Sequence, residues 1–317
     1  MPIIEFKNIT KTYQGKLILD SISLSFERGE FYTLIGPSGA GKTTLLRLIN
    51  GLIKPDSGQI FVDGKDIAAS DLIELRRNIG YVIQSIGLFP HMSIYDNINY
   101  VPSLRKTGKA IRKDRVLELI KLVGMEESDL LKYPSQLSGG QKQRIGVSRA
   151  LAGNPDIILM DEPFGAVDDI TRHKLQDEIR DIHTKLQKTI IFVTHDIEEA
   201  IKLGTRIIIL NDGKIEQIGT KLDIVFHPKN DFVKDFLGEK NYIAYLSITK
   251  IGDVCDKDIT NIGTYPSIRA DQPIIEGLRR LLSGEASALS VVDAENNVIG
   301  IYDLGCSQWI KKPSALL

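Results

Sequence analysis

A glycine-rich stretch between a predicted strand and a predicted helix carries the strongest chemical signal in the chain. It fills the pattern Gly-x-x-x-x-Gly-Lys-Thr and follows the apolar run 31–35. Glycines here let successive backbone N–H groups face phosphate oxygens, and the helix that begins here adds the positive end of its dipole. Lys42 would reach the terminal phosphates, and the Thr43 hydroxyl would bind Mg²⁺. The sequence therefore predicts a nucleoside triphosphate site formed by Gly36, Pro37, Ser38, Gly39, Ala40, Gly41, Lys42, Thr43 and Thr44.

Two adjacent carboxylates end a second apolar run. Residues 157–160 read Ile-Ile-Leu-Met and are followed by Asp161 and Glu162. Parallel sheets place ligands at the carboxyl ends of their strands, so these acids are predicted to lie at the nucleotide. Asp161 would hold Mg²⁺ directly or through water, and Glu162 would orient the attacking water or accept its proton. The alternative, two solvated acids at a strand end, is disfavoured by the phosphate-binding loop upstream.

A third signal lies at the start of a polar helix. Residues 137–141 read Leu-Ser-Gly-Gly-Gln, which places a serine at the N-cap and two glycines in the first turn. Such a helix start can bind a second phosphate group. Because one nucleotide does not need two such sites in one chain, the pattern suggests a nucleotide shared between two chains. An ordinary helix cap is the alternative interpretation.

Composition sets broad limits on the class of protein. The 317 residues carry a formal net charge of -1, so the overall charge does not suggest a nucleic-acid-binding protein. Two cysteines, Cys255 and Cys306, without histidine or cysteine at metal-ligand spacing favour a reducing, cytoplasmic setting. We find no signal-peptide pattern and no apolar run of the roughly 20 residues that span a bilayer. We therefore expect a protein that is not itself embedded in a membrane.

The order of elements predicts an α/β core with an inserted helical part. Strand patterns within 3–35 precede the phosphate-binding loop, and helical periodicity dominates about residues 90–155. Strands and helices then alternate to about residue 210, which favours a mostly parallel sheet. After residue 240 the elements become short: a strand, a helix over 273–282 and a hairpin. We predict one domain over residues 1–240 and a small α+β domain over 241–317.

With these motifs in this order, the chain resembles the ATP-binding subunits of ABC transporters, whose signature matches residues 137–141. The resemblance covers residues 1 to about 240. It implies a P-loop NTPase core with an antiparallel β subdomain and an inserted helical subdomain. It also implies a head-to-tail homodimer, with ATP between the phosphate-binding loop of one chain and Ser138, Gly139, Gly140 and Gln141 of the other. ATP and Mg²⁺ are the implied cofactors.

The resemblance also assigns roles to single residues. By similarity, Tyr13 stacks on the adenine, Gln84 senses the γ-phosphate and helps to bind Mg²⁺, and His195 contacts the γ-phosphate. Asp168 belongs to the segment that crosses the dimer. The implied catalytic set is thus Glu162, His195, Lys42 and Gln84, and the implied metal ligands are Thr43, Gln84 and Asp161.

Two further stretches resemble importers for quaternary amines such as glycine betaine, carnitine and choline. These are residues 80–92 around Gln84 and residues 162–168. The segment 241–317 is similar to one CBS module, with a small packing or dimerisation domain as the alternative. Two features depart from this subfamily, which usually carries two CBS modules and more often has Leu and Pro where Val167 and Asp169 stand.

We therefore expect an ATPase at the cytoplasmic face of a bacterial inner membrane. Its partners would be integral-membrane permease subunits and, indirectly, an extracytoplasmic solute-binding protein, without nucleic acid. Two alternatives remain: an importer ATPase for another small solute, such as an amino acid derivative, and an ABC ATPase that acts outside transport. Long coiled coils and a second ATPase half, which are typical of DNA-repair and ribosome-associated members, are not indicated by the sequence.

Overall fold

The structure is a computed structural model that describes residues 2–83, 87–105, 108–165, 167–238, 240–257 and 265–305. Gln84, to which the resemblance gives two roles, lies outside these residues. The chain forms two compact units, Met1–Ile218 and Gly219–Leu317, and each is considered by itself. In the described part of the chain, no helix is both long and apolar enough to cross a membrane.

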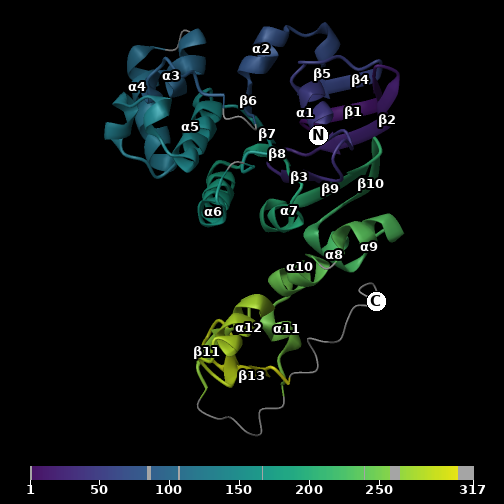
Figure 1. The fold of residues 1–317 in the computed structure, drawn as a ribbon, viewed down its shortest axis with the longest axis vertical. Coiled ribbons are helices and arrows are strands. Elements are labelled where there is room, and N and C mark those ends of the chain that lie inside the picture. Colours follow the sequence, from purple (N-terminus) through teal and green to yellow (C-terminus); the bar gives the residue numbers. More distant parts are fainter. Residues whose placement is uncertain are drawn as a thin grey trace. The chain divides into compact units, whose positions relative to one another are not determined.

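Two sheets form the framework of the first unit (Figure 1). The larger has the strand order β10-β9-β3-β8-β7-β6, and the pairs that β3, β7 and β8 make within it are parallel. Its strands are β3 (Phe31–Ile35), β6 (Ile79–Val82), β7 (Ile157–Asp161), β8 (Thr189–Val193), β9 (Arg206–Asn211) and β10 (Lys214–Gly219). The smaller sheet has the order β2-β1-β4-β5 and contains β1 (Ile4–Tyr13), β2 (Lys16–Phe26), β4 (Ser57–Val62) and β5 (Lys65–Asp66).

Strands β3, β7 and β8 are buried along their whole length, which explains their unbroken apolar sequence. Helices α1 (Lys42–Ile49), α2 (Leu72–Arg77), α6 (Asp169–Leu186) and α7 (Ile197–Leu203) connect the strands, together with the 3₁₀ turn η1 (Ile67–Ala69). Helix α1 ends at Ile49, because Gly51 adopts a left-handed conformation with φ 64° just beyond the C-cap Asn50.

A helical subdomain is inserted between β6 and β7, as the periodicity predicts. It contains α3 (Ile94–Leu104), α4 (Lys109–Leu122), α5 (Gly139–Ala152) and the 3₁₀ turns η2 (Glu127–Leu131) and η3 (Pro134–Gln136). Ile98, Leu119 and Ile145 are among the apolar side chains of this subdomain that are fully buried in one cluster, which continues to β7 and β8. The predicted α/β core with its β subdomain and helical insertion is confirmed.

The second unit is small and mixed. It contains α8 (Lys221–Phe226), α9 (Asp231–Leu237), α10 (Lys240–Ile248), α11 (Ile251–Val254), α12 (Ile274–Leu282) and the sheet β11-β12-β13, formed by Ser267–Arg269, Ala288–Val292 and Val298–Asp303. The sequence placed a boundary after residue 240, whereas the units part after Ile218. Helix α8 contacts α10, with Phe226 edge-on to Tyr245, so α8 belongs to the second unit.

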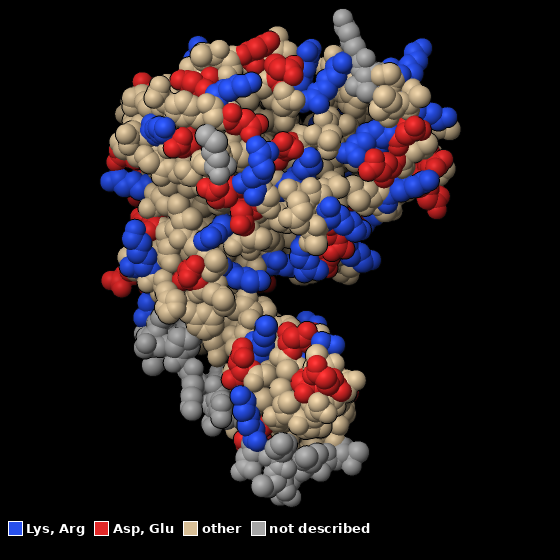
Figure 2. All heavy atoms as spheres, turned by 180° about the vertical axis from the view of Figure 1, so that it is seen from behind, with Lys and Arg blue, Asp and Glu red and all other residues tan. Residues whose placement is uncertain are grey.

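Charged side chains of both signs are interspersed over the face shown in Figure 2, as the near-zero net charge leads us to expect.

Candidate functional site

The phosphate-binding loop connects β3 to α1 and depends on glycine at two positions. Gly36 has φ 151°, and a Cβ there would lie 2.0 Å from the carbonyl oxygen of Leu210. Gly41 has φ 101°, and a Cβ would lie 2.6 Å from Leu19 Cδ2. Gly41 is also the N-cap of α1 and has no side chain to occupy the first N–H groups of the helix. These groups are left for a ligand, which is the arrangement that binds phosphate.

Lys42 is folded back onto its own loop. Its Nζ donates hydrogen bonds to the carbonyl oxygens of Gly36 at 2.7 Å and Pro37 at 2.9 Å. The side chain is buried, and this burial lowers the pKa of Lys42, while the nearby Glu162 and Asp161 oppose the shift. A cation held with little water can interact strongly with a phosphate, because few solvent contacts have to be replaced.

Asp161, the last residue of β7, lies beside the loop. The Thr43 hydroxyl donates a hydrogen bond to Asp161 Oδ1 at 2.9 Å, so a hydroxyl and a carboxylate oxygen converge. Such oxygens are the ligands that Mg²⁺ prefers, and a site with two protein oxygens leaves positions for phosphate and water. Burial raises the pKa of Asp161, although the bond from Thr43 counters this shift. The donor set thus fits a magnesium ion.

The raised pKa of Asp161 gives a prediction about stability. Between pH 3.8, the usual pKa, and the raised value, the folded chain binds more protons than the unfolded chain. Stability therefore falls as pH rises through this window, and the ionised carboxylate costs folding free energy at neutral pH. We expect Asp161→Asn, which keeps an acceptor for Thr43, to raise the Tm of the nucleotide-free protein by roughly 2–4 °C. The additional rise that Mg²⁺ and ATP give the wild type should be lost.

Thermal unfolding with and without Mg²⁺ and ATP would measure both effects. Asp156→Asn is the matched control, since Asp156 precedes the other end of β7, is 55% exposed and forms ion pairs with Arg28 and Lys188. It should give no rise in Tm. A lower Tm for nucleotide-free Asp161→Asn would contradict the prediction.

Glu162 follows Asp161 in a left-handed conformation, φ 44°, which is uncommon for a residue other than glycine. Its N–H donates a hydrogen bond to the carbonyl of Val193, the end of β8, at 3.0 Å. His195 lies two residues after Val193, and its Nδ1 is 3.4 Å from Glu162 Oε2. The imidazole is 71% exposed and the carboxylate 26% exposed, so both groups are accessible to a ligand.

These groups open onto one cleft of about 430 Å³. Tyr13 also lines this cleft; the residue is 42% exposed, and Lys11 Nζ lies 5.4 Å from its ring centroid. An exposed aromatic ring beside the loop can stack on a planar base. The residues that line the cleft are Tyr13, Ile18, Ser38, Gly39, Ala40, Gly41, Lys42, Thr43, Thr44, Glu162 and His195.

The second predicted phosphate-binding helix start does not line this cleft in the described part of the chain. Ser138 is the N-cap of α5, where its Oγ accepts from Gln141 N at 3.3 Å and Gln141 Oε1 accepts from Ser138 N. Ser138 and Gly139 are exposed. Asp168 caps α6 by accepting from Thr171 N at 3.0 Å, and this bond lowers the pKa of Asp168. Neither segment lines the nucleotide cleft of its own chain.

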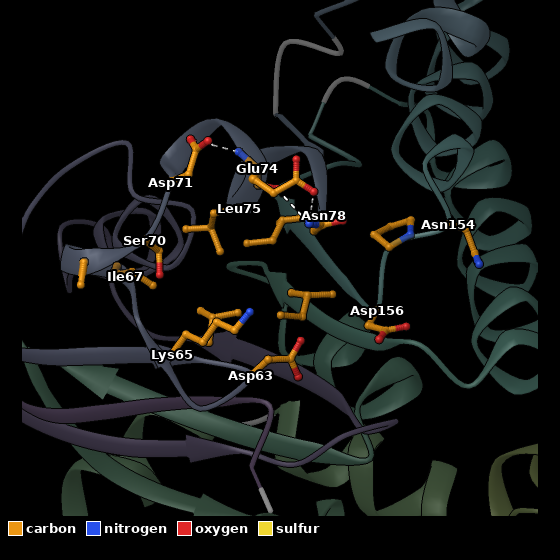
Figure 3. Close-up of a pocket in the computed structure, with 15 residues that line it drawn as sticks. Asp63, Lys65, Ile67, Ser70, Asp71, Glu74, Leu75, Asn78, Asn154 and Asp156 are labelled. Atoms are coloured by element: carbon orange, nitrogen blue, oxygen red, sulfur yellow. Dashed lines mark hydrogen bonds between the residues drawn. The ribbon is translucent and has the colours of Figure 1, made fainter. Parts of the chain in front are cut away.

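A larger cleft of about 540 Å³ lies at the amino-terminal ends of β6 and β7 (Figure 3). Glu74 of α2 and Asn78, the C-cap of this helix, line it together with Asp63 and Asp156. This is the opposite end of β7 from Asp161. Its carboxylates disfavour a polyphosphate, so the smaller cleft is the better nucleotide site.

Sequence reasoning missed Ile18, which lines the nucleotide cleft, and Tyr81, which lies beside Asp161. Burial raises the pKa of Tyr81 to about 12, with the charge of Asp161 adding to the shift, so the phenol stays neutral. Both residues have the sequence appearance of ordinary strand positions. Only the alternation along β6 could have suggested that Tyr81 approaches the end of the neighbouring β7.

Comparisons with known proteins agree with this geometry. Residues 19–165 match the family model described as ABC transporter. The chain is 45% identical over 317 residues to the glycine betaine/carnitine/choline transport ATP-binding protein OpuCA of Bacillus subtilis, with 99% of this chain and 82% of that protein covered. The chain belongs to the ATP-binding subunits of ABC transporters. As a member of this family it binds and hydrolyses ATP.

Other relatives support the same assignment. The glycine betaine uptake system ATP-binding protein YehX of Escherichia coli is 40% identical, with 94% of this chain and 96% of that protein covered. A solved dimeric ATP-binding cassette bound to ADP and Pi matches with a TM-score of 0.63 and 37% identity, over 68% of this chain and 98% of that one. The name of YehX refers to uptake, and this ABC subunit is the energy-coupling ATPase of an importer.

Proposed function

We propose that the solute of this importer is a quaternary ammonium osmoprotectant such as glycine betaine, carnitine or choline. The observation that carries the proposal is similarity over nearly the whole chain to proteins named for these solutes. Three of them are 45–47% identical and cover 95–99% of this chain. The similarity therefore extends beyond the ATP-binding core into the second unit.

A relative with a different solute makes this point sharper. The spermidine/putrescine import ATP-binding protein PotA of Pasteurella multocida is 43% identical, but the match covers 80% of this chain. The percentage identity is thus similar for the relatives named for the two kinds of solute, whereas the share of this chain that the match covers differs. A polyamine importer is the second candidate function, and the smaller coverage of the chain disfavours it.

The proposed catalytic roles follow from the positions in the cleft. Backbone N–H groups of the loop and Lys42 bind and orient the phosphates, and Lys42 stabilises charge on the transferred phosphoryl group. Glu162 accepts the proton of the attacking water. His195, whose Nδ1 lies 3.4 Å from Glu162 Oε2, contacts the γ-phosphate. Gln84 lies outside the described residues, and its role at the γ-phosphate is proposed from the family resemblance alone. Tyr13 stacks on the adenine.

Thr43 and Asp161 would hold Mg²⁺, which when bound neutralises charge on the β- and γ-phosphates.

The proposed assembly is a head-to-tail homodimer. Ser138, Gly140 and Gln141 bind the ATP that sits on the loop of the partner chain, and Asp168 crosses the interface. Support comes from the exposed start of α5, which does not line the cleft of its own chain, and from solved cassettes that are dimers. Permease subunits in the cytoplasmic membrane and an extracytoplasmic solute-binding protein complete the proposed system, with this chain at the cytoplasmic face.

Uptake by the complete transporter tests the solute. The ATPase would be reconstituted with its permease and solute-binding protein, and labelled glycine betaine, carnitine, choline, spermidine and an amino acid would be offered in turn. We expect ATP-dependent accumulation of at least one quaternary amine. Uptake of spermidine or the amino acid alone would overturn the assignment.

Removal of residues 241–317 tests our proposal that this segment is a CBS-like module that is not needed for ATP hydrolysis. Every residue that lines the nucleotide cleft lies between Tyr13 and His195, so we expect the fragment 1–240 to bind and hydrolyse ATP within about threefold of the full chain. The fragment lacks Tyr245, which covers Phe226 in the full chain, so the solubility of the fragment should be lower. Regulation of uptake by salt or nucleotide should change. A fragment that is folded by circular dichroism but does not bind ATP would contradict the prediction that residues 1–240 are sufficient for ATP binding.

A further inference from the structure

A buried carboxylate between α6 and α7 has no place in the mechanism above. Glu199, in the first turn of α7, is 6% exposed, although it carries an ionisable group. Burial raises its pKa, and hydrogen bonds from Thr194 and Gln176 counter this effect. A buried carboxylate costs folding free energy that an apolar residue would not, so its presence requires an explanation.

One side of Glu199 holds the turn that carries His195. The hydroxyl of Thr194 donates a hydrogen bond to Glu199 Oε2 at 2.5 Å. The same hydroxyl accepts from the N–H of Asp196 at 3.0 Å. Thr194 and Asp196 flank His195, so Glu199 restrains the turn on both sides of the imidazole, which is itself exposed.

The other side of Glu199 faces α6, which lies alongside α7 (Figure 1). Gln176 Nε2 donates to Glu199 Oε1 at 3.3 Å, and Arg172 Nε lies 3.9 Å from the same oxygen. Arg172 Nη2 in turn donates to the carbonyl of Val167 at 3.0 Å, and its Nη1 donates to Asp169 at 2.9 Å. Val167 and Asp169 are the neighbours of Asp168.

We propose that Glu199 is a positioning residue that fixes the turn of His195 relative to the segment 167–169. Through Glu199, the turn that carries His195 at the γ-phosphate and the segment 167–169 at the partner chain move as one body. The inference rests on the proposed dimer, in which Asp168 crosses to the second chain. The segments 194–196 and 167–169 are then joined through the Glu199 carboxylate and not by backbone contacts alone.

Steady-state ATP hydrolysis by the full chain tests the proposal. We expect Glu199→Ala to lower kcat between about 10- and 100-fold, because small misplacements of reacting groups have effects of this size. The Kd for ATP should stay within about threefold, since Lys42 and the loop are not touched. Glu199→Gln, which keeps an acceptor for Thr194, should recover most of kcat. The matched control is Glu198→Ala, an exposed glutamate one position earlier, which should behave as the wild type.

A purely structural role predicts a different pattern. Glu199→Ala would then lower the Tm while kcat per folded molecule stayed at the wild-type value, and that result would overturn the proposal. So would equal losses in Glu199→Gln and Glu199→Ala. If Glu199→Ala does not fold, a cycle of Thr194→Val, Arg172→Lys and the double variant replaces it. We expect the two effects on kcat to be non-additive, and additivity would overturn the proposal.

The dimer gives a second readout. In a Glu162→Gln background, Glu199→Ala should shift the ATP-dependent dimer to monomer on gel filtration, and Glu198→Ala should not. An unchanged dimer fraction would remove the link to the partner chain. Neither result depends on the solute, so failure of the uptake experiment and failure of this inference are distinguishable.

Discussion

Replacement of Glu162 by glutamine should abolish ATP turnover and leave ATP binding intact. The amide keeps the volume and one acceptor of the carboxylate but is too weak a base to take the proton of the attacking water. We expect kcat to fall by about 10²- to 10⁴-fold, the usual contribution of a general base. The Kd for ATP should change less than threefold, because Lys42 and the loop glycines still hold the phosphates.

Because hydrolysis opens the proposed dimer, the same variant should accumulate as an ATP-bound dimer. Gel filtration with and without ATP, together with phosphate release, measures both effects. Glu198→Gln is the control, since it makes the same chemical change at an exposed carboxylate that does not line the cleft. Substantial residual hydrolysis by Glu162→Gln would show that another group activates the water.

Replacement of Lys42 by alanine should instead weaken ATP binding. The ammonium is buried, and it donates two hydrogen bonds within the loop, to the carbonyl oxygens of Gly36 and Pro37. The variant loses a charge-assisted contact to phosphate, which is worth about 1.5–3 kcal/mol, and it also loses these restraints on the loop. We expect the Kd for ATP to rise by about 100-fold, with hydrolysis undetectable at millimolar ATP.

Isothermal titration calorimetry would measure the Kd. Lys54→Ala removes an exposed lysine shortly after the same helix and should leave the Kd unchanged. A variant at Lys42 that binds ATP as tightly as the wild type would refute the role of the loop. The contrast with Glu162→Gln separates binding from chemistry within one cleft.

Local patterns were sufficient to predict most elements of the first unit. The apolar run at 157–160 and the periodicity of 197–203 match β7 and α7 closely, because each is encoded by consecutive residues. The end of α1 is not visible in the local pattern, since apolar residues continue past Asn50 while the backbone of Gly51 turns left-handed. The α8–α10 contact was also missed, because it joins residues far apart in the sequence.

The candidate site divides in the same way. The sequence alone determined the loop 36–44, since glycines at fixed spacing before a lysine specify a backbone geometry within nine residues. It also determined that Asp161 and Glu162 end a strand. Their chemical types and local positions needed no tertiary information.

Only the tertiary structure decided which of these groups meet. Thr43 reaches Asp161, and Glu162 reaches His195, because the order β3-β8-β7 brings three strand ends to one edge of the sheet. Glu199 had the sequence appearance of a solvated acid next to Glu198, and it is buried only because α6 packs against α7. Strand order and helix packing depend on the burial of whole elements, which no local pattern encodes.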